Sequence, residues 1–158
     1  MVEGVTVPAL VIGYGNDLRG DDGIGSRVAD AVAAWRRPGV EVLSLVQLTP
    51  EVAATLASAE RVVFVDADAR PDAPGVALRP VTPAPEIAAI THGADPCALL
   101  ALCQAVYGRC PAAWLLTVPA RRFDIGAPLS PAAEAGVAQA LTLLDAWLRD
   151  ELPSTAPI

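Results

Sequence analysis

The chain has no lysine, a single histidine and only three cysteines among its 158 residues. Cys97, Cys103 and Cys110 are odd in number and show no C-x-x-C spacing, which speaks against a disulfide framework and against a cysteine zinc site. We therefore expect them to be packing residues. The formal net charge of −7 at pH 7 speaks against nucleic-acid binding, because that function needs a basic surface.

Long apolar runs are also lacking, although hydrophobic residues make up 53% of the chain. The richest stretch, 98–107, is about half the roughly 20 residues that a membrane helix needs, and Gln104 interrupts it. No basic segment precedes an apolar one at the N-terminus, so we expect no signal peptide and a cytoplasmic protein without membrane contact. A chain of this length fits one domain, which we place at 1–151, with a flexible tail over 152–158.

The segment 10–35 organises the rest of the chain. It opens with the apolar run 10–12, breaks at the glycine-rich loop 13–16, and carries two adjacent acids, Asp21 and Asp22, before apolar residues recur at helical spacing. This order predicts a strand, a long loop and a helix. Because burying an unpaired charge is costly, the two carboxylates are either helix-capping groups or ligands for a positively charged group.

Further strands and helices alternate along the chain. Apolar runs predict strands over 40–46, 62–65 and 113–118, with an edge strand or hairpin arm over 76–81. A capping residue followed by proline occurs at Thr49-Pro50, Asp95-Pro96 and Ser130-Pro131. These pairs predict three helices, each with its cap, over 49–58, 95–108 and 130–148. The expected fold is a single-domain α/β three-layer sandwich, in which helices cover both faces of a mostly parallel, twisted sheet of about five strands.

Topology brings carboxylates together in this fold. If the strand order begins 2-1-3, the first and third strands are neighbours. Asp21 and Asp22 after the first strand would then lie beside Asp66, which follows the run 62–65. Sites of such sheets form beyond the carboxyl ends of the strands, where the strand order reverses.

Two known uses of this sheet fit the sequence poorly. Gly13-Tyr14-Gly15 resembles the start of the dinucleotide motif G-x-G-x-x-G, but Leu18 stands at the third glycine position and the loop is acidic. A phosphoacceptor receiver domain would use an acidic pair and a later aspartate, but it also needs a lysine, which this chain lacks.

The single histidine, His92, lies in the loop before the helix that starts at Asp95-Pro96. Two strand-end carboxylates and one imidazole would suit nickel, zinc, manganese or iron and would leave coordination positions open for substrate or water. The alternatives are a packed or surface histidine, and a pair of aspartates that only cap the first helix.

These motifs together resemble the maturation endopeptidases of nickel-iron hydrogenases. The resemblance covers about 10–148 and rests on GYGNDLRGDDGIG with its amphipathic helix, VVFVDA, THGADP, and LTVP before LSP. It implies that 1–151 is a maturation protease domain in which Asp22, Asp66 and His92 bind nickel and carry the catalytic role.

The implied partner is the precursor of a nickel-iron hydrogenase large subunit. The family recognises nickel already inserted in this precursor and removes a C-terminal peptide, so the nickel is substrate-borne; zinc or cadmium could occupy the site in vitro. Many members have a Gly-Gly-Thr turn after the second strand, where this chain has Val46-Gln47-Leu48-Thr49-Pro50. The class of hydrogenase that it serves therefore stays open.

Peptide hydrolysis by a metal-assisted route is the most economical mechanism. No G-x-S-x-G elbow presents a serine, and Cys97 lies in an apolar helical stretch. Asp22, Asp66 and His92 would complete the coordination of the substrate's nickel, and a metal-bound water or a free carboxylate oxygen would assist attack. Asn16 would orient the loop or serve as a turn residue, and Asp21 would orient it or cap the helix.

Two functions of other classes remain open: a nickel-checking chaperone that binds the precursor without shortening it, and a metallohydrolase of small molecules. Arg121 and Arg122 could contact the precursor, although a solvated surface pair explains them equally simply. We expect a monomer.

Overall fold

The computed structural model describes residues 7–85 and 95–150, so that His92 and the predicted tail over 152–158 lie outside the described residues. The elements follow in chain order. They are β1 (Val7–Tyr14), the 3-10 helix η1 (Gly20–Gly23), α1 (Ile24–Ala34), β2 (Val40–Leu45), α2 (Val52–Ala57), β3 (Ala59–Asp68), β4 (Ala77–Val81), α3 (Pro96–Tyr107), β5 (Ala112–Pro119) and α4 (Pro131–Leu148).

The five strands form one sheet in the order β2-β1-β3-β5-β4. The pairs β1–β2, β1–β3 and β3–β5 are parallel, whereas β4 runs antiparallel to β5 at the edge. The predicted order 2-1-3 and the predicted edge strand over 76–81 are therefore confirmed. Pro80 lies in β4, which is consistent with an edge position because proline has no N–H to donate to a neighbouring strand.

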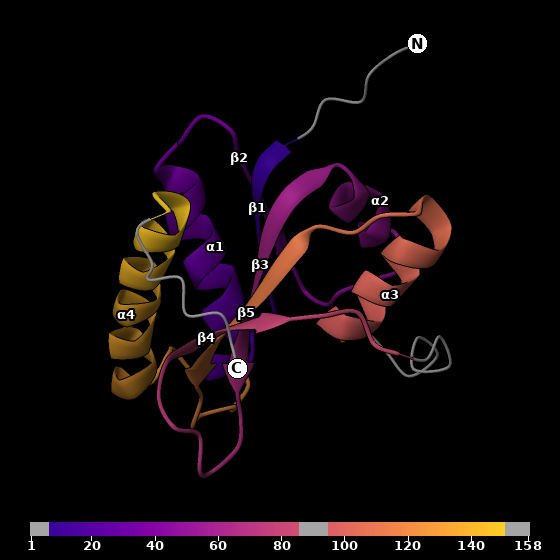
Figure 1. The fold of residues 1–158 in the computed structure, drawn as a ribbon. Coiled ribbons are helices and arrows are strands. Elements are labelled where there is room, and N and C mark those ends of the chain that lie inside the picture. Colours follow the sequence, from indigo (N-terminus) through magenta and orange to yellow (C-terminus); the bar gives the residue numbers. More distant parts are fainter. Residues whose placement is uncertain (1–6, 86–94, 151–158) are drawn as a thin grey trace.

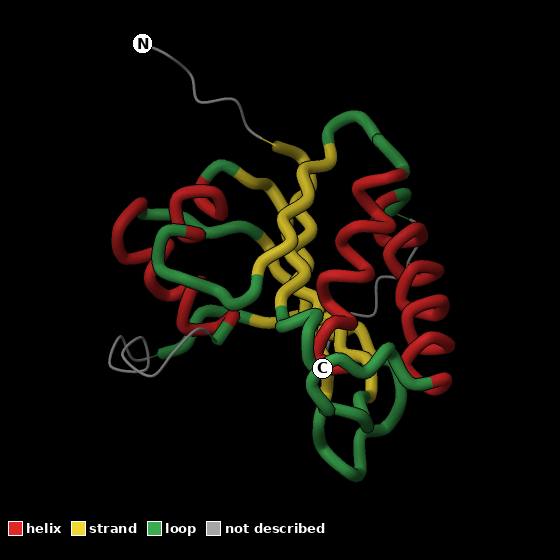
Figure 2. The backbone as a smooth tube through the Cα atoms, turned by 180° about the vertical axis from the view of Figure 1, so that it is seen from behind, coloured by secondary structure: helices red, strands yellow, loops and turns green. Residues whose placement is uncertain are grey.

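Helices cover both faces of the sheet: α1 and α4 lie on one side, and α2 and α3 on the other (Figures 1 and 2). The alternation of side chains along each strand separates the two apolar cores. In β1, Val11 packs in the core with α1 and α4, whereas Ile12 packs in the core with α2 and α3. This arrangement confirms the predicted three-layer sandwich. Among the described helices, none has both the length and the apolar character that crossing a membrane requires.

The capping residues set the starts of the two long C-terminal helices as predicted. The Asp95 side chain accepts a hydrogen bond from the Cys97 N–H at 2.7 Å, and the Ser130 side chain accepts one from the Ala133 N–H at 3.1 Å. Gly108, with φ of 75°, ends α3 in the left-handed conformation. The predicted helix cap at Thr49 is wrong by two residues, because 50–51 form a turn, Glu51 is the N-cap and α2 begins at Val52.

Two strand boundaries also differ from the predictions. β2 ends at Leu45, and the next residue, Val46, is 69% exposed. β3 extends to Asp68 because its ladder with β5 continues through Asp66↔Thr117 to Asp68↔Pro119. Asp66 therefore lies inside the strand and shares its backbone rigidity.

Candidate functional site

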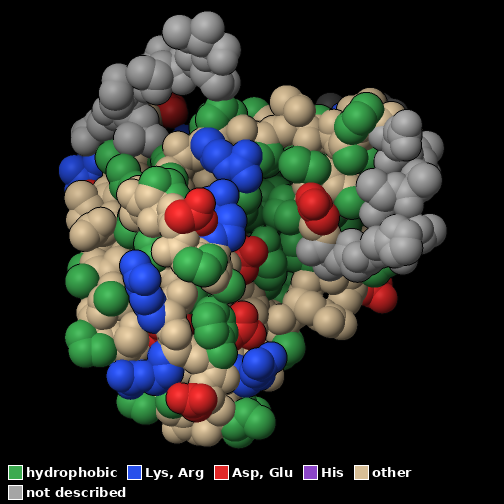
Figure 3. Space-filling view, turned by 90° about the horizontal axis from the view of Figure 1, so that it is seen from below, with side chains coloured by type: hydrophobic (Ala, Val, Ile, Leu, Met, Phe, Trp, Pro, Cys, Tyr) green, Lys and Arg blue, Asp and Glu red, His purple; other side chains and the backbone are tan. Residues whose placement is uncertain are grey.

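A cavity of about 520 Å³ opens at the carboxyl ends of the central strands. Its walls are the end of β1, the loop 46–50 after β2, Asp66 of β3 and the first turns of α3, with Asp22 of η1 beside them. Figure 3, which views the molecule from below, shows a hollow lined by hydrophobic side chains with acidic side chains at its border. Most of the walls are apolar, and Asp22 and Asp66 are the acidic residues that line the cavity.

Asp66 is held from the neighbouring strand. Residues 10 and 12 of β1 and residues 62 and 64 of β3 all point toward α2 and α3, so that side-chain alternation places Tyr14 and Asp66 on the same face. The Tyr14 hydroxyl donates a hydrogen bond to Asp66 Oδ2 at 3.1 Å.

Burial raises the pKa of Asp66 to about 6. The nearby charges of Asp22 and Asp68 raise it further, while hydrogen bonds from the Tyr14 hydroxyl and the Ala67 N–H act in the opposite direction. Burial, followed by the charge of Asp66, also raises the pKa of Tyr14. The tyrosine therefore remains a neutral hydrogen-bond donor to the carboxylate across the physiological range.

Asp22 is fixed by the glycine-rich loop. Its Oδ2 accepts a hydrogen bond from the Asn16 N–H at 2.8 Å, and the Asn16 side chain accepts one from the Leu18 N–H at 3.0 Å in a local turn. Gly15 has φ of +141°, and a Cβ there would overlap the carbonyl oxygen of Asp22. The chain therefore needs glycine at this position for its conformation and for the close approach of the two backbone segments.

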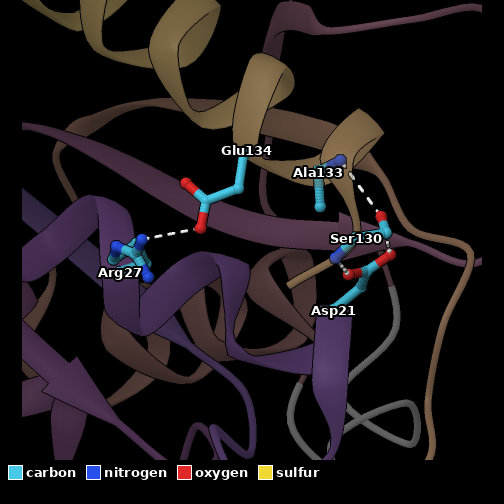
Figure 4. A network of polar contacts seen from close by, with 5 residues as sticks. All are labelled: Asp21, Arg27, Ser130, Ala133 and Glu134. Atoms are coloured by element: carbon cyan, nitrogen blue, oxygen red, sulfur yellow. Dashed lines mark hydrogen bonds and ion pairs between the residues drawn. The ribbon is translucent and has the colours of Figure 1, made fainter. Parts of the chain in front are cut away.

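Asp21 faces away from the cavity and is completely buried. Its carboxylate accepts hydrogen bonds from the N–H groups of Arg121, Arg122 and Ser130 and from the Ser130 hydroxyl, at 2.7–3.0 Å. Burial alone would raise the pKa of Asp21, but these hydrogen bonds outweigh it and hold the pKa below its usual range. Figure 4 shows Asp21 against Ser130 at the start of α4.

Neither aspartate caps the first helix by a side-chain hydrogen bond. The N-cap residue of α1 is Gly23, and no described side chain bonds to the N–H groups of this first turn. The capping interpretation is therefore wrong for both, and the two neighbours point to different places. Asp22 lines the cavity, whereas Asp21 fastens η1 to the segment that leads into α4.

Of the three predicted metal ligands, the structure brings Asp22 and Asp66 to one cavity, and His92 lies outside the described residues. Within residues 7–85 and 95–150, no group of three His, Cys, Asp or Glu side chains is close enough to hold a metal ion. Two carboxylates provide hard oxygen ligands but not a closed coordination shell.

The three cysteines are free, and Cys103 is buried in the core with α2 and α3, as a packing residue should be. Burial and then the charge of Asp95 raise the pKa of Cys97, which lies next to the cavity-lining Ala98. A raised pKa leaves the thiol protonated and a poor nucleophile. This agrees with the sequence-based argument against thiol catalysis.

Two cavity features are absent from the predicted site. The loop 46–50 forms a whole wall, with Leu48 buried and Gln47 exposed, and the sequence gives no local signal of where it folds. Tyr14 was predicted only as part of the glycine loop. The apolar alternation Leu10, Ile12, Tyr14 in a strand next to β3 could have placed its side chain beside Asp66.

Comparison with solved structures finds several that share this fold. The hydrogenase maturating endopeptidase HybD from E. coli matches with a TM-score of 0.71 and 26% identity, over 90% of this chain and 93% of that one. A hydrogenase 2 maturation peptidase from a Thaumarchaeota archaeon matches with a TM-score of 0.68 and 25% identity, over 92% of this chain and 99% of that one. The [NiFe] hydrogenase maturation protease HycI from Thermococcus kodakarensis matches with a TM-score of 0.69 and 21% identity, over 92% of this chain and 95% of that one.

No protein-family model matches the chain, and no curated protein sequence matches it. The likeness therefore rests on structure together with modest identity that extends over about nine-tenths of the chain.

Proposed function

We propose that this chain, which is similar in fold and sequence to hydrogenase maturation endopeptidases, removes the C-terminal peptide from the nickel-loaded precursor of a nickel-iron hydrogenase large subunit. The observation that carries the proposal is the cavity in which Asp22 and Asp66, from separate segments, lie together at the carboxyl ends of β1 and β3. HybD is named a hydrogenase maturating endopeptidase, and HycI is named a [NiFe] hydrogenase maturation protease.

The nickel of this reaction belongs to the substrate. Asp22 and Asp66 would add carboxylate oxygens to an ion that the precursor already holds through its own ligands, which explains why the described part of the cavity needs no complete ligand set. His92 is the third proposed ligand. Only three peptide units separate it from Asp95, a chain reach of about 11 Å, and the helix after Asp95 lines the cavity through Ala98 and Leu99.

The chain's own groups have separable tasks in the cleavage. The apolar walls, such as Leu48 and Leu99, hold the extended peptide and limit access of bulk water. A carboxylate of Asp22 or Asp66 takes a proton from the attacking water while the oxygen of that water bonds to the carbonyl carbon of the peptide. The carboxylic acid formed in this way returns the proton to the departing amine as the C–N bond breaks, so that the carboxylate is regenerated and the products are a carboxylic acid and an amine.

The test is the intact mass of a purified large-subunit precursor, nickel-loaded or nickel-free, after incubation with this protein. We expect shortening of the nickel-loaded form only. Asp22→Asn, Asp66→Asn and His92→Ala should each lose at least about 100-fold in rate while keeping a cooperative thermal transition. Asp17→Asn is the matched control, because Asp17 is an exposed acid of the same loop that does not line the cavity.

Other outcomes of this experiment would overturn the proposal. A precursor that binds the protein in a nickel-dependent manner but keeps its full mass would indicate a checking chaperone. Turnover of a small amide with added metal, without any cleavage of the precursor, would indicate a metallohydrolase. We propose that the protein works as a cytoplasmic monomer; cell fractionation and sedimentation would test both points.

A further inference from the structure

Tyr14 is the aromatic residue that closes β1, and its side chain enters the candidate site. It lines the cavity, and its hydroxyl donates to Asp66 Oδ2 at 3.1 Å. The chain has only one other tyrosine. That residue, Tyr107, is exposed at the end of α3 and does not line the cavity.

The backbone determines where this hydroxyl lies. β1 and β3 are parallel and in register, with Gly13 opposite Val65, so that Tyr14 and Asp66 are the next residues on adjacent strands. The Tyr14 ring packs against the apolar core that includes Ile12 and Phe64. A tyrosine ring has few rotatable bonds, so packing of the ring also fixes the position of its oxygen.

A fixed donor restricts how the carboxylate can turn. Without a partner, the Asp66 carboxyl group can rotate about its terminal torsion, because torsions of this type have broad minima. A hydrogen bond to Oδ2 selects one orientation. Partners of this kind orient ligating carboxylates in metal sites, and their removal costs about 10- to 100-fold in metal affinity or activity.

We propose that Tyr14 is a positioning residue: its hydroxyl holds the Asp66 carboxylate in the orientation that receives the cation carried by the substrate. This inference rests on the proposed function, in which Asp66 is a ligand to that cation. A purely structural role for Tyr14 would lie in the packing of its ring, which phenylalanine reproduces.

The experiment compares Tyr14→Phe with the matched control Tyr107→Phe, since each removes one hydroxyl and keeps the ring. Calorimetric titration with Ni²⁺ measures affinity directly, and intact mass of the nickel-loaded precursor gives kcat and KM. For Tyr14→Phe we expect about 10- to 100-fold weaker Ni²⁺ binding and a comparable loss in kcat, with an unchanged melting temperature. The control variant should match the wild type.

A double-mutant cycle separates positioning from packing. In an Asp66→Asn background, Tyr14→Phe should cause no further loss of Ni²⁺ affinity, because the oriented carboxylate is already gone. Equal losses in both backgrounds, or no loss in the single variant, would overturn the proposal for Tyr14 and leave the proposed function intact. A wild-type protein that leaves the nickel-loaded precursor uncut would overturn the proposed function, and Tyr14 would then be judged on Ni²⁺ affinity alone.

Discussion

Asp21 and Ser130 are 109 positions apart in the sequence and are joined by two hydrogen bonds of 2.7 Å, from the Ser130 N–H to Oδ1 and from the Ser130 hydroxyl to Oδ2. Ser130 also accepts from the Ala133 N–H and so caps α4 (Figure 4). One serine therefore serves both the last helix and the loop that carries Asp22. The stability of α4 and the geometry of the candidate site are thus coupled through this contact.

Replacing Asp21 by asparagine should destabilise the protein by about 2–4 kcal/mol. The amide keeps one acceptor oxygen but turns an NH2 group toward donors that need an acceptor. Urea unfolding of Asp21→Asn measures the loss. Asp30→Asn, an exposed acid of α1, should stay within about 0.5 kcal/mol of the wild type, and equal stability of the two variants would contradict this account.

The depressed pKa of Asp21 also predicts a pH dependence. Its folded-state pKa lies below the unfolded value of 3.8, so its contribution to stability is fully present above pH 3.8 and disappears as the pH falls through the folded-state pKa. Acid titration of the unfolding free energy should therefore show a steeper loss below about pH 4 for the wild type than for Asp21→Asn. Parallel curves would argue against the role of the buried carboxylate.

Ser130→Ala should cost about 1–3 kcal/mol, because it removes the cap of α4 and one donor to Asp21 together. Ser26→Ala is the matched control, since Ser26 forms an exposed hydrogen bond with Ser44 and should cost less than about 1 kcal/mol. In the double variant Asp21→Asn/Ser130→Ala, the losses should be smaller than their sum, because both changes remove the same contact. Chemical denaturation checks all three variants.

Gly15→Ala should abolish precursor cleavage and lower the stability, because the new Cβ would push the backbone of Asp22 out of place. Gly75→Ala is a useful control: Gly75 also has a positive φ, +116°, but a Cβ there meets no atom within 4 Å. It should show only the backbone strain of about 1 kcal/mol and keep its activity. A Gly15→Ala variant with wild-type cleavage would contradict the close packing at this point.

Asp66→Asn should lose activity and gain stability at neutral pH. Burial raises the folded-state pKa of Asp66 from 3.8 to about 6, so the folded wild type binds more protons than the unfolded chain between these values. The stability of the wild type therefore falls as the pH rises from about 4 to 6, by at most about 3 kcal/mol. Asp66→Asn should lack this fall, as unfolding measured at pH 4 and pH 7 would show.

Local sequence patterns predicted the elements that local physics determines. Apolar runs located β1, β3 and β5, and side-chain caps followed by proline located α3 and α4. Topology rules for parallel sheets then placed Asp22 and Asp66 at one end of the sheet, where both line the cavity.

The remaining features depend on contacts between distant segments. Nothing near Asp21 in the sequence indicates Ser130 as its partner, and nothing near Val46 indicates that 46–50 forms a cavity wall. The start of α2 was misplaced for a related reason: Thr49 and Pro50 begin turns whose carbonyl groups accept from Val52 and Ala53, which delays the regular helix. A capping residue in the sequence therefore predicts where the chain begins to turn more reliably than it predicts which residue is the first of the regular helix.

The hydrogen bonds between η1 and the start of α4 also affect the stage of synthesis at which the candidate site can form. A ribosome delivers the chain from its N-terminus, and domains form as their segments emerge. β1, η1 and Asp22 emerge early, but their anchor, Ser130, is made only when about four-fifths of the chain has been translated. An incomplete chain thus carries the acidic loop without the partner that fastens it, so cleavage competence should arise only after the last helix has begun to leave the exit tunnel.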